Sequence, residues 1–81
     1  METVYEIDLH GLTMSETKMV LDEVFEYVKG NINIREIHIV VGVGKGSLMG
    51  PVLPAFVVRY VEEKGLVAVL REGVVFVDIK N

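Results

Sequence analysis

The sequence predicts an α/β fold: a two-layer sandwich in the order β-α-β-α-β-β, with a mixed four-stranded sheet and two helices packed on one face. Three observations predict it. Short runs of β-branched residues typical of strands alternate with two longer stretches in which apolar residues recur at helical spacing. A strand, a helix and another strand at the start form a crossover unit, which makes those two strands parallel neighbours. The last two strands lie close in sequence and predict an antiparallel hairpin.

The first helix carries the clearest boundary signals. Thr13 lies three residues before Glu16, which is the spacing of a capping box and predicts that the helix begins at Met14. Apolar side chains then recur at helical spacing and form one stripe, at Val20, Leu21, Val24, Phe25 and Val28. Gly30 is expected to end the helix after Lys29 by adopting a left-handed conformation.

The other elements follow from shorter patterns. Strands are predicted at residues 4–9, 36–41, 66–70 and 74–79, with residues 71–73 as the tight connection of the last pair. A second helical stripe runs from Leu53 to Val61. Pro54 suits the first turn of that helix, and Gly65 ends it. These patterns leave the order of the strands within the sheet open.

Composition indicates a single domain over residues 1–81. The chain has 81 residues, of which 51% are apolar, and it has no cysteine. Disulfides and thiolate zinc ligands are therefore excluded, and the core must supply the stability. No apolar run approaches the roughly 18–20 residues that span a bilayer, and the first residues lack the pattern of a signal peptide. We therefore expect a cytoplasmic protein with no membrane contact.

Two unusual segments follow the two parallel strands. Residues 8–11 (Asp-Leu-His-Gly) end the first strand, and residues 41–47 (Val-Gly-Val-Gly-Lys-Gly-Ser) end the second. The carboxyl ends of parallel strands meet at one edge of a sheet, where loops leave and ligands commonly bind. The topology therefore predicts that both segments lie on the same rim.

Asp8 and His10 are the candidate catalytic pair on this rim. They are two residues apart, and on extended backbone that spacing points both side chains to the same face. A carboxylate beside an imidazole can orient the ring and fix its tautomer, so the pair could act as general base, general acid or phosphate ligand. The alternative is an aspartate and a histidine that merely end a strand.

The glycine-rich segment is the candidate phosphate contact. Glycines allow close backbone approach, so that successive N–H groups can point at an anion, and Lys45 adds a full positive charge. The spacing of Gly42, Gly44 and Gly46 fits neither the dinucleotide fingerprint nor a Walker A loop. The alternative is a loop that needs glycine only for its turn.

The motifs of both segments resemble those of the Smr (small MutS-related) family. Residues 7–12 read Ile-Asp-Leu-His-Gly-Leu, and the family's first motif is Leu-Asp-Leu-His-Gly leading into a helix. Residues 41–44 align with the second family motif, Thr-Gly-x-Gly or His-Gly-x-Gly, and Ser47, Gly50 and Leu53 follow it without gaps. The spacing of the motifs, the two helices and the closing strand pair also agree, so the resemblance covers nearly the whole chain.

The resemblance implies a fold and a function. Smr domains form a two-layer α/β sandwich like the C-terminal domain of translation initiation factor three, and they occur alone or at the C-terminus of MutS-like proteins. Several are described as nicking endonucleases or nucleic-acid binders. The resemblance implies that Asp8 and His10 are the catalytic residues, and that the nucleic acid is bound by Gly11, Gly42, Gly44, Lys45 and Ser47.

Two features favour binding without cleavage. Val41 stands where the family commonly has threonine or histidine, and Gly46 replaces a histidine of one branch. Eight basic residues stand against twelve acidic ones, for a net charge of −4, which opposes tight nonspecific binding of nucleic acid. The resemblance as a whole nevertheless implies a nucleic-acid-binding domain with endonuclease activity that nicks DNA or RNA, with His10 and Asp8 acting at the phosphodiester. The alternative is a non-catalytic nucleic-acid-binding or protein-interaction module of a larger MutS-like protein. No cofactor is certain; Mg²⁺ or Mn²⁺ stays open, and no metal ligands are predicted.

Overall fold

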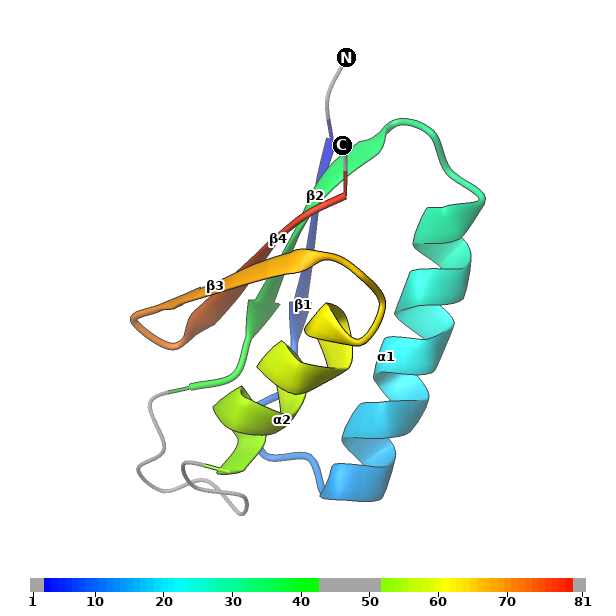
Figure 1. Cartoon of the computed structure of the whole chain (residues 1–81). Helices are drawn as coiled ribbons and strands as arrows, with labels where there is room; N and C mark the ends of the chain where they lie inside the picture. The colour runs from blue at the N-terminus through cyan, green and yellow to red at the C-terminus, as the bar shows by residue number, and fades with distance from the viewer. Residues whose placement is uncertain (1–2, 43–51, 80–81) are drawn as a thin grey trace.

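The computed structural model describes residues 3–42 and 52–79, and it has the predicted order of elements (Figure 1). The strands and helices are β1 (Thr3–Asp8), α1 (Met14–Lys29), β2 (Ile34–Val40), α2 (Val52–Glu62), β3 (Val67–Arg71) and β4 (Val74–Asp78). The boundaries of α1 are those that the capping box and Gly30 predicted. Each strand boundary differs from its prediction by at most two residues.

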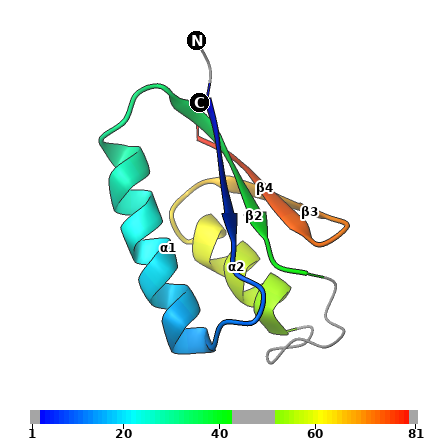
Figure 2. The same cartoon turned by 180° about the vertical axis from the view of Figure 1, so that it is seen from behind.

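The four strands form one mixed sheet in the order β1-β2-β4-β3. β1 and β2 are parallel, as the crossover unit predicted, and β4 pairs antiparallel with both β2 and β3. The last strand of the chain therefore lies inside the sheet, while β1 and β3 are its two edges. Both helices cover the same face, and the opposite face carries no helix (Figures 1 and 2).

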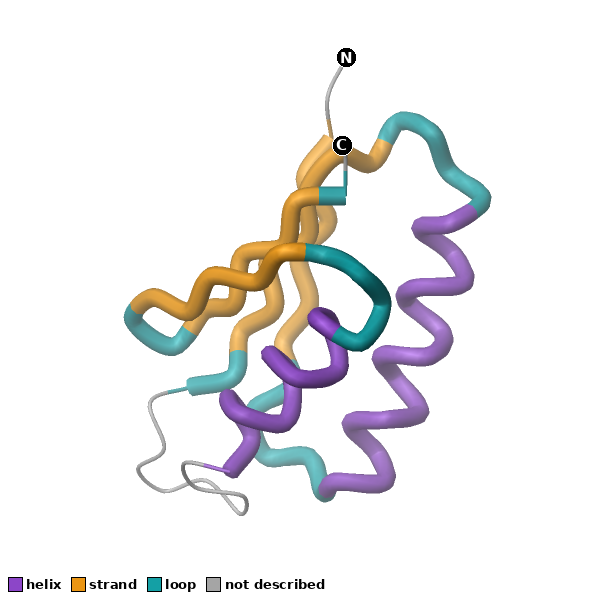
Figure 3. Tube along the Cα trace, viewed as in Figure 1, coloured by secondary structure: helices purple, strands orange, loops and turns teal. Residues whose placement is uncertain are grey.

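The core lies between the helices and the covered face of the sheet. The most central strands contribute Ile37 and Ile39 from β2 and Val75 and Val77 from β4, all fully buried. The tube view shows the two layers that enclose these side chains (Figure 3). The helices complete the core with seven apolar side chains. These are Leu21, Val24, Phe25 and Val28 of α1 and Leu53, Val57 and Val61 of α2. Burial of this apolar surface is the main stabilising term of the fold.

Local signals explain where the elements begin and end. The Thr13 hydroxyl accepts from the Glu16 N–H at 3.2 Å, and the Glu16 carboxylate accepts from the Thr13 N–H at 2.9 Å, so the capping box is confirmed. Gly30 ends α1, but the predicted left-handed conformation is wrong: its φ is −93°, and its N–H still donates to the Tyr27 carbonyl. Gly65, after α2, does adopt a left-handed φ of +81°.

The connection between β3 and β4 is a two-residue turn. Arg71 belongs to β3, so the turn consists of Glu72 and Gly73, with φ angles of +49° and +81°. Two positive φ angles in sequence match the twist of the flanking strands and define the tightest hairpin connection.

Among the helices of the described residues, none is long and apolar enough to cross a membrane.

Candidate functional site

The end of β1 places Asp8 and His10 on the rim, which here means the edge of the sheet where β1 and β2 end. Leu9, between them, is fully buried, and its N–H donates to the Val40 carbonyl at 2.8 Å. The backbone at Leu9 is therefore fixed against β2. Alternation along the chain turns the two neighbours outward, and their side chains are 55% and 65% exposed.

Two hydrogen bonds join Asp8 to His10. Asp8 Oδ1 lies 2.6 Å from His10 Nδ1, and the same oxygen accepts from the His10 backbone N–H at 3.1 Å. An ionised carboxylate can only accept, so Nδ1 carries the proton in this bond. No described residue forms a hydrogen bond with His10 Nε2.

The same bonds determine the charge state of the carboxylate. Donation from the His10 ring, followed by donation from the His10 backbone N–H, holds the pKa of Asp8 below its usual value, although slight burial works in the opposite direction. Asp8 is therefore an anion throughout the neutral range, and it holds the imidazole in one orientation.

Gly42, at the end of the second strand, lies directly beside His10. It follows β2 with a φ of +79°, and a Cβ built on it would be 3.7 Å from His10 Cβ. The predicted meeting of the two segments on one rim is therefore confirmed at this position. The side chain of Val41, the residue before Gly42, is fully buried in the core.

Gly73 is a residue of the rim that the sequence did not single out. Its carbonyl accepts from the N–H groups of Val41 at 2.8 Å and Gly42 at 3.1 Å. A Cβ at Gly73 would lie only 3.2 Å from the Gly42 carbonyl carbon. The β3–β4 turn therefore supports Gly42, which in turn lies against His10. The only signal in the sequence was a tight turn, and nothing local placed that turn next to residue 42.

The remaining predicted site residues divide into two groups. Gly11 lies in the exposed loop between β1 and α1 with a φ of +85°, and a Cβ on it would meet nothing within 4 Å. Gly44, Lys45 and Ser47 lie outside the described residues.

A shallow hollow of about 530 Å³ lies next to the rim, between the amino ends of the two helices. Met14, the first residue of α1, and Val52, the first of α2, line it together with Ala55, Phe56 and Arg59. Arg59 forms no ion pair with any residue in the described part of the chain. This hollow thus offers an aromatic ring and a positive charge, a combination that suits nucleic-acid strands.

Within residues 3–42 and 52–79, no three His, Asp or Glu side chains come close enough together to hold a metal ion. His38, the second histidine, lies on the uncovered face of the sheet. Its Nε2 is 3.2 Å from Glu36 Oε1, and its ring is 4.6 Å from that of Phe76. The Asp8–His10 pair does not form a metal site by itself.

The sequence matches the family model of the Smr domain over residues 7–78. The chain belongs to the Smr domain family. Domains of this family are in general nucleic-acid-binding domains of a nicking-endonuclease type. No curated protein and no solved structure matches the chain in these comparisons. The matched range begins near the end of β1 and includes all later elements and Asp8, His10, Gly42 and Gly73 of the rim.

Proposed function

We propose that this Smr domain is a phosphodiesterase that nicks DNA or RNA at the rim. The observation that carries the proposal is the Asp8–His10 pair, with Nδ1 bonded to a carboxylate and Nε2 directed to no described residue. This is the arrangement in which an imidazole acts as general base or acid, because its tautomer is fixed and its second nitrogen can exchange a proton with a ligand. Family membership supports the substrate class.

His10 would perform the proton transfers. Its Nε2 takes a proton from the attacking oxygen, which is a water molecule or, on RNA, a ribose hydroxyl. A new P–O bond forms, the bond to the leaving oxygen breaks, and the leaving oxygen takes up a proton. Asp8 stabilises the positive charge on the imidazole while it holds the extra proton. Proton transfer of this kind contributes roughly 10²–10⁴ to a rate.

Gly42 would contribute its lack of a side chain rather than its amide. Its N–H already donates to the Gly73 carbonyl, so this group is occupied. Its φ of +79° would be strained in a residue with a side chain, and a Cβ there would be in van der Waals contact with His10 Cβ at 3.7 Å. In this proposal, charge on the phosphate is stabilised by Lys45 and by the backbone at Gly44 and Ser47, and Gly11 lets the backbone approach the substrate closely.

A requirement for a divalent cation, Mg²⁺ or Mn²⁺, is a separate question that the assay below tests. The described residues do not supply three metal-binding groups in one place, so no step is assigned to a metal. We propose a cytoplasmic setting, since the chain has no cysteine to form disulfides.

The decisive experiment is a nicking assay with both histidine variants. Supercoiled plasmid and structured RNA are incubated with the protein, His10→Ala and His38→Ala, each with and without Mg²⁺ or Mn²⁺. We expect the protein and His38→Ala to cleave and His10→Ala to be at least about 100-fold slower. His38 is the matched control because it is the only other histidine and lies on the uncovered face. Equal cleavage by His10→Ala would overturn the assignment.

A second function is favoured by Val41. The family's polar residue is replaced here by a buried valine, and the net charge is −4. These features suit a module that binds nucleic acid without cutting it, alone or within a MutS-like protein. Binding of the same RNA or DNA by filter retention, with no cleavage under any metal condition, would establish this alternative.

A further inference from the structure

β3 is an edge strand whose apolar side chains are unusually exposed to solvent. It forms one edge of the sheet, and no strand of the described part of the chain pairs with its outer side. Val67 is 69% exposed, Val69 is 47% exposed and Leu70 is 46% exposed. Leu70 lies on the face that the helices cover, so β3 shows apolar side chains to solvent on both faces. Exposed apolar surface of this kind marks interaction sites.

The other edge of the sheet is built differently. On the uncovered face, β1 presents Val4, Glu6 and Asp8, so two of its three outward side chains are carboxylates. Charges of this kind prevent a strand edge from pairing with another chain. β3 carries no charge from Val67 to Leu70. Only one edge of this sheet is therefore open to strand addition.

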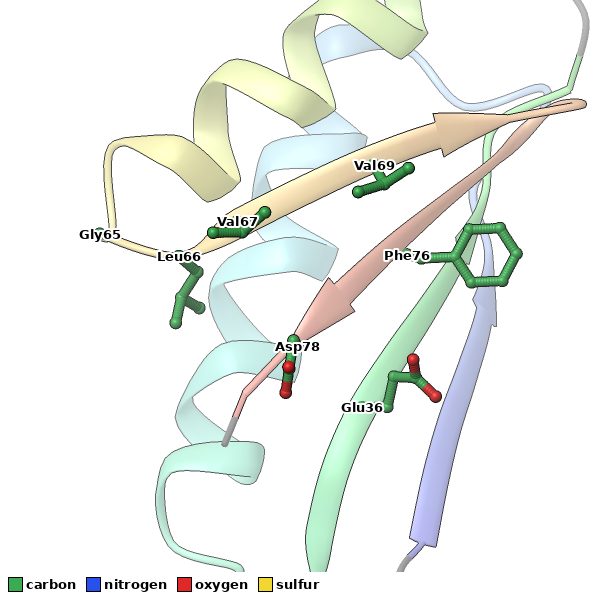
Figure 4. Close-up of a pocket in the computed structure, with 7 residues that line it drawn as sticks. All are labelled: Glu36, Gly65, Leu66, Val67, Val69, Phe76 and Asp78. Atoms are coloured by element: carbon green, nitrogen blue, oxygen red, sulfur yellow. The ribbon is translucent and has the colours of Figure 1, made fainter. Parts of the chain in front are cut away.

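The uncovered face beside β3 continues the apolar surface. A hollow of about 360 Å³ is lined by Val67 and Val69 of β3 and Phe76 of β4, with the carboxylates of Glu36 and Asp78 at one end (Figure 4). The register places Glu36, Asp78 and Val67 in one row across the sheet, and His38, Phe76 and Val69 in the next. Arg71 lies at the opposite end of β3 from this acidic row.

We propose that the chain forms a two-fold symmetric dimer in which β3 pairs antiparallel with β3 of a second copy. This inference goes beyond the proposed function and does not depend on it. Pairing centred on Val69 uses the whole five-residue strand: Val69 opposes Val69, Ala68 opposes Leu70, and Val67 opposes Arg71. Residues of the same face then meet, which a shift by one residue would prevent.

The charges at the two ends of β3 favour a second copy of the chain as the partner of this edge. In the antiparallel arrangement, Arg71 of each copy lies in the same row as Val67, Asp78 and Glu36 of the other copy, so a cation faces an acidic row twice. The dimer also closes the assembly, because the eight-stranded sheet would end at two β1 strands, the edges that carry Glu6 and Asp8. Further strand addition is then blocked at both ends.

Sedimentation equilibrium on the whole chain tests the dimer, with one lysine variant for each edge. We expect a dimer fraction that rises with protein concentration for the parent chain and for Val4→Lys. Val69→Lys should weaken the dimer at least about tenfold, because two like charges would oppose each other at the centre of the interface. Circular dichroism establishes that each variant is folded. A chain that remains monomeric at all concentrations, or a folded Val69→Lys that dimerises unchanged, would overturn the proposal.

A disulfide test defines the register. The chain has no cysteine, so Val69→Cys introduces a single thiol, and Val4→Cys is the matched control on the other edge. Directly opposed residues of antiparallel strands have Cα atoms about 4.5–5.5 Å apart, within the range of a disulfide. Under mild oxidation we expect a covalent dimer of Val69→Cys and little of Val4→Cys. Equal cross-linking of the two variants would contradict pairing through β3.

Discussion

At the scale of single residues, the rim depends on a buried leucine between two exposed polar side chains. Leu9 fixes the backbone to β2, and this leaves Asp8 and His10 close enough for the 2.6 Å contact between Oδ1 and Nδ1. The pair needs no other side chain to hold it. Because both residues are exposed, their removal should affect chemistry far more than folding.

The low pKa of Asp8 gives a direct measure of this pair. Since the pKa is lowered mainly by the hydrogen bond from the His10 ring, the stabilising contact is present at neutral pH and is lost as the pH falls through the lowered pKa. We expect the ¹³C carboxyl titration of Asp8 to have its midpoint below the usual aspartate range and to move upward in His10→Ala. An unchanged midpoint in that variant would mean that the ring does not bond Asp8 in solution.

Two glycines of the rim make a matched pair for stability measurements. Gly11 and Gly73 have similar φ angles of +85° and +81°, so alanine is strained at both by about 1 kcal/mol. Gly73→Ala should cost more, because its Cβ would also lie 3.2 Å from the Gly42 carbonyl carbon, whereas the space at Gly11 is open. Urea unfolding of both variants measures the difference. Equal losses would show that the turn can move away from Gly42.

At the scale of elements, α1 and α2 are joined by one polar contact outside the core. Tyr60 Oη donates to Asp22 Oδ1 at 2.5 Å, and Lys64 Nζ lies 4.9 Å from the centre of the Tyr60 ring. Partial burial and then the Asp22 hydrogen bond raise the pKa of Tyr60 well above its usual value. The neutral phenol therefore stabilises the fold below the usual tyrosine pKa, and this contribution is lost as the pH rises beyond it.

Removal of that hydroxyl should have a pH-dependent effect. We expect Tyr60→Phe to unfold at a lower temperature than the parent chain at neutral pH, and we expect the difference to shrink above about pH 10. Thermal unfolding followed by circular dichroism at a series of pH values tests this. Tyr27→Phe is the control, since Tyr27 is exposed and its ring contacts Tyr5 instead of α2. A difference that stays constant with pH would contradict the role of the phenol.

The elements themselves were predictable where their signals are local. Thr13, Glu16 and Gly30 define α1 because caps act within one turn of the chain. The order of the strands was not predictable, because the insertion of β4 between β2 and β3 depends on pairing between residues far apart in sequence. For the same reason the sequence indicated Asp8, His10 and Gly42 but not Gly73, whose contact with Gly42 arises only when β4 pairs with β2.

At the scale of the whole molecule, a net charge of −4 opposes a polyanion, so binding must depend on where the cations lie. Arg59 lines the hollow beside the rim, whereas Arg35 lies near the start of β2, at the opposite end of the parallel strands. Arg59→Gln and Arg35→Gln change the net charge equally. We expect only Arg59→Gln to weaken binding of single-stranded DNA or RNA, by about tenfold, in fluorescence anisotropy at fixed salt. Equal weakening would mean that total charge, rather than position, determines affinity.

The interior position of β4 also has a consequence for the order in which this protein is made. Residues 74–78 are the last of the four strands of this sheet to be synthesised, yet β2 and β3 are joined in the sheet only through them. A nascent chain that stops at Gly73 has the β1–α1–β2 unit but lacks Val75 and Val77, two fully buried residues of the core. We infer that the sheet is completed only after synthesis has passed Asp78. The hydrogen bond from the Gly42 N–H to the Gly73 carbonyl then forms only when β4 pairs with β2, whereas the Asp8–His10 pair lies within the β1–α1–β2 unit.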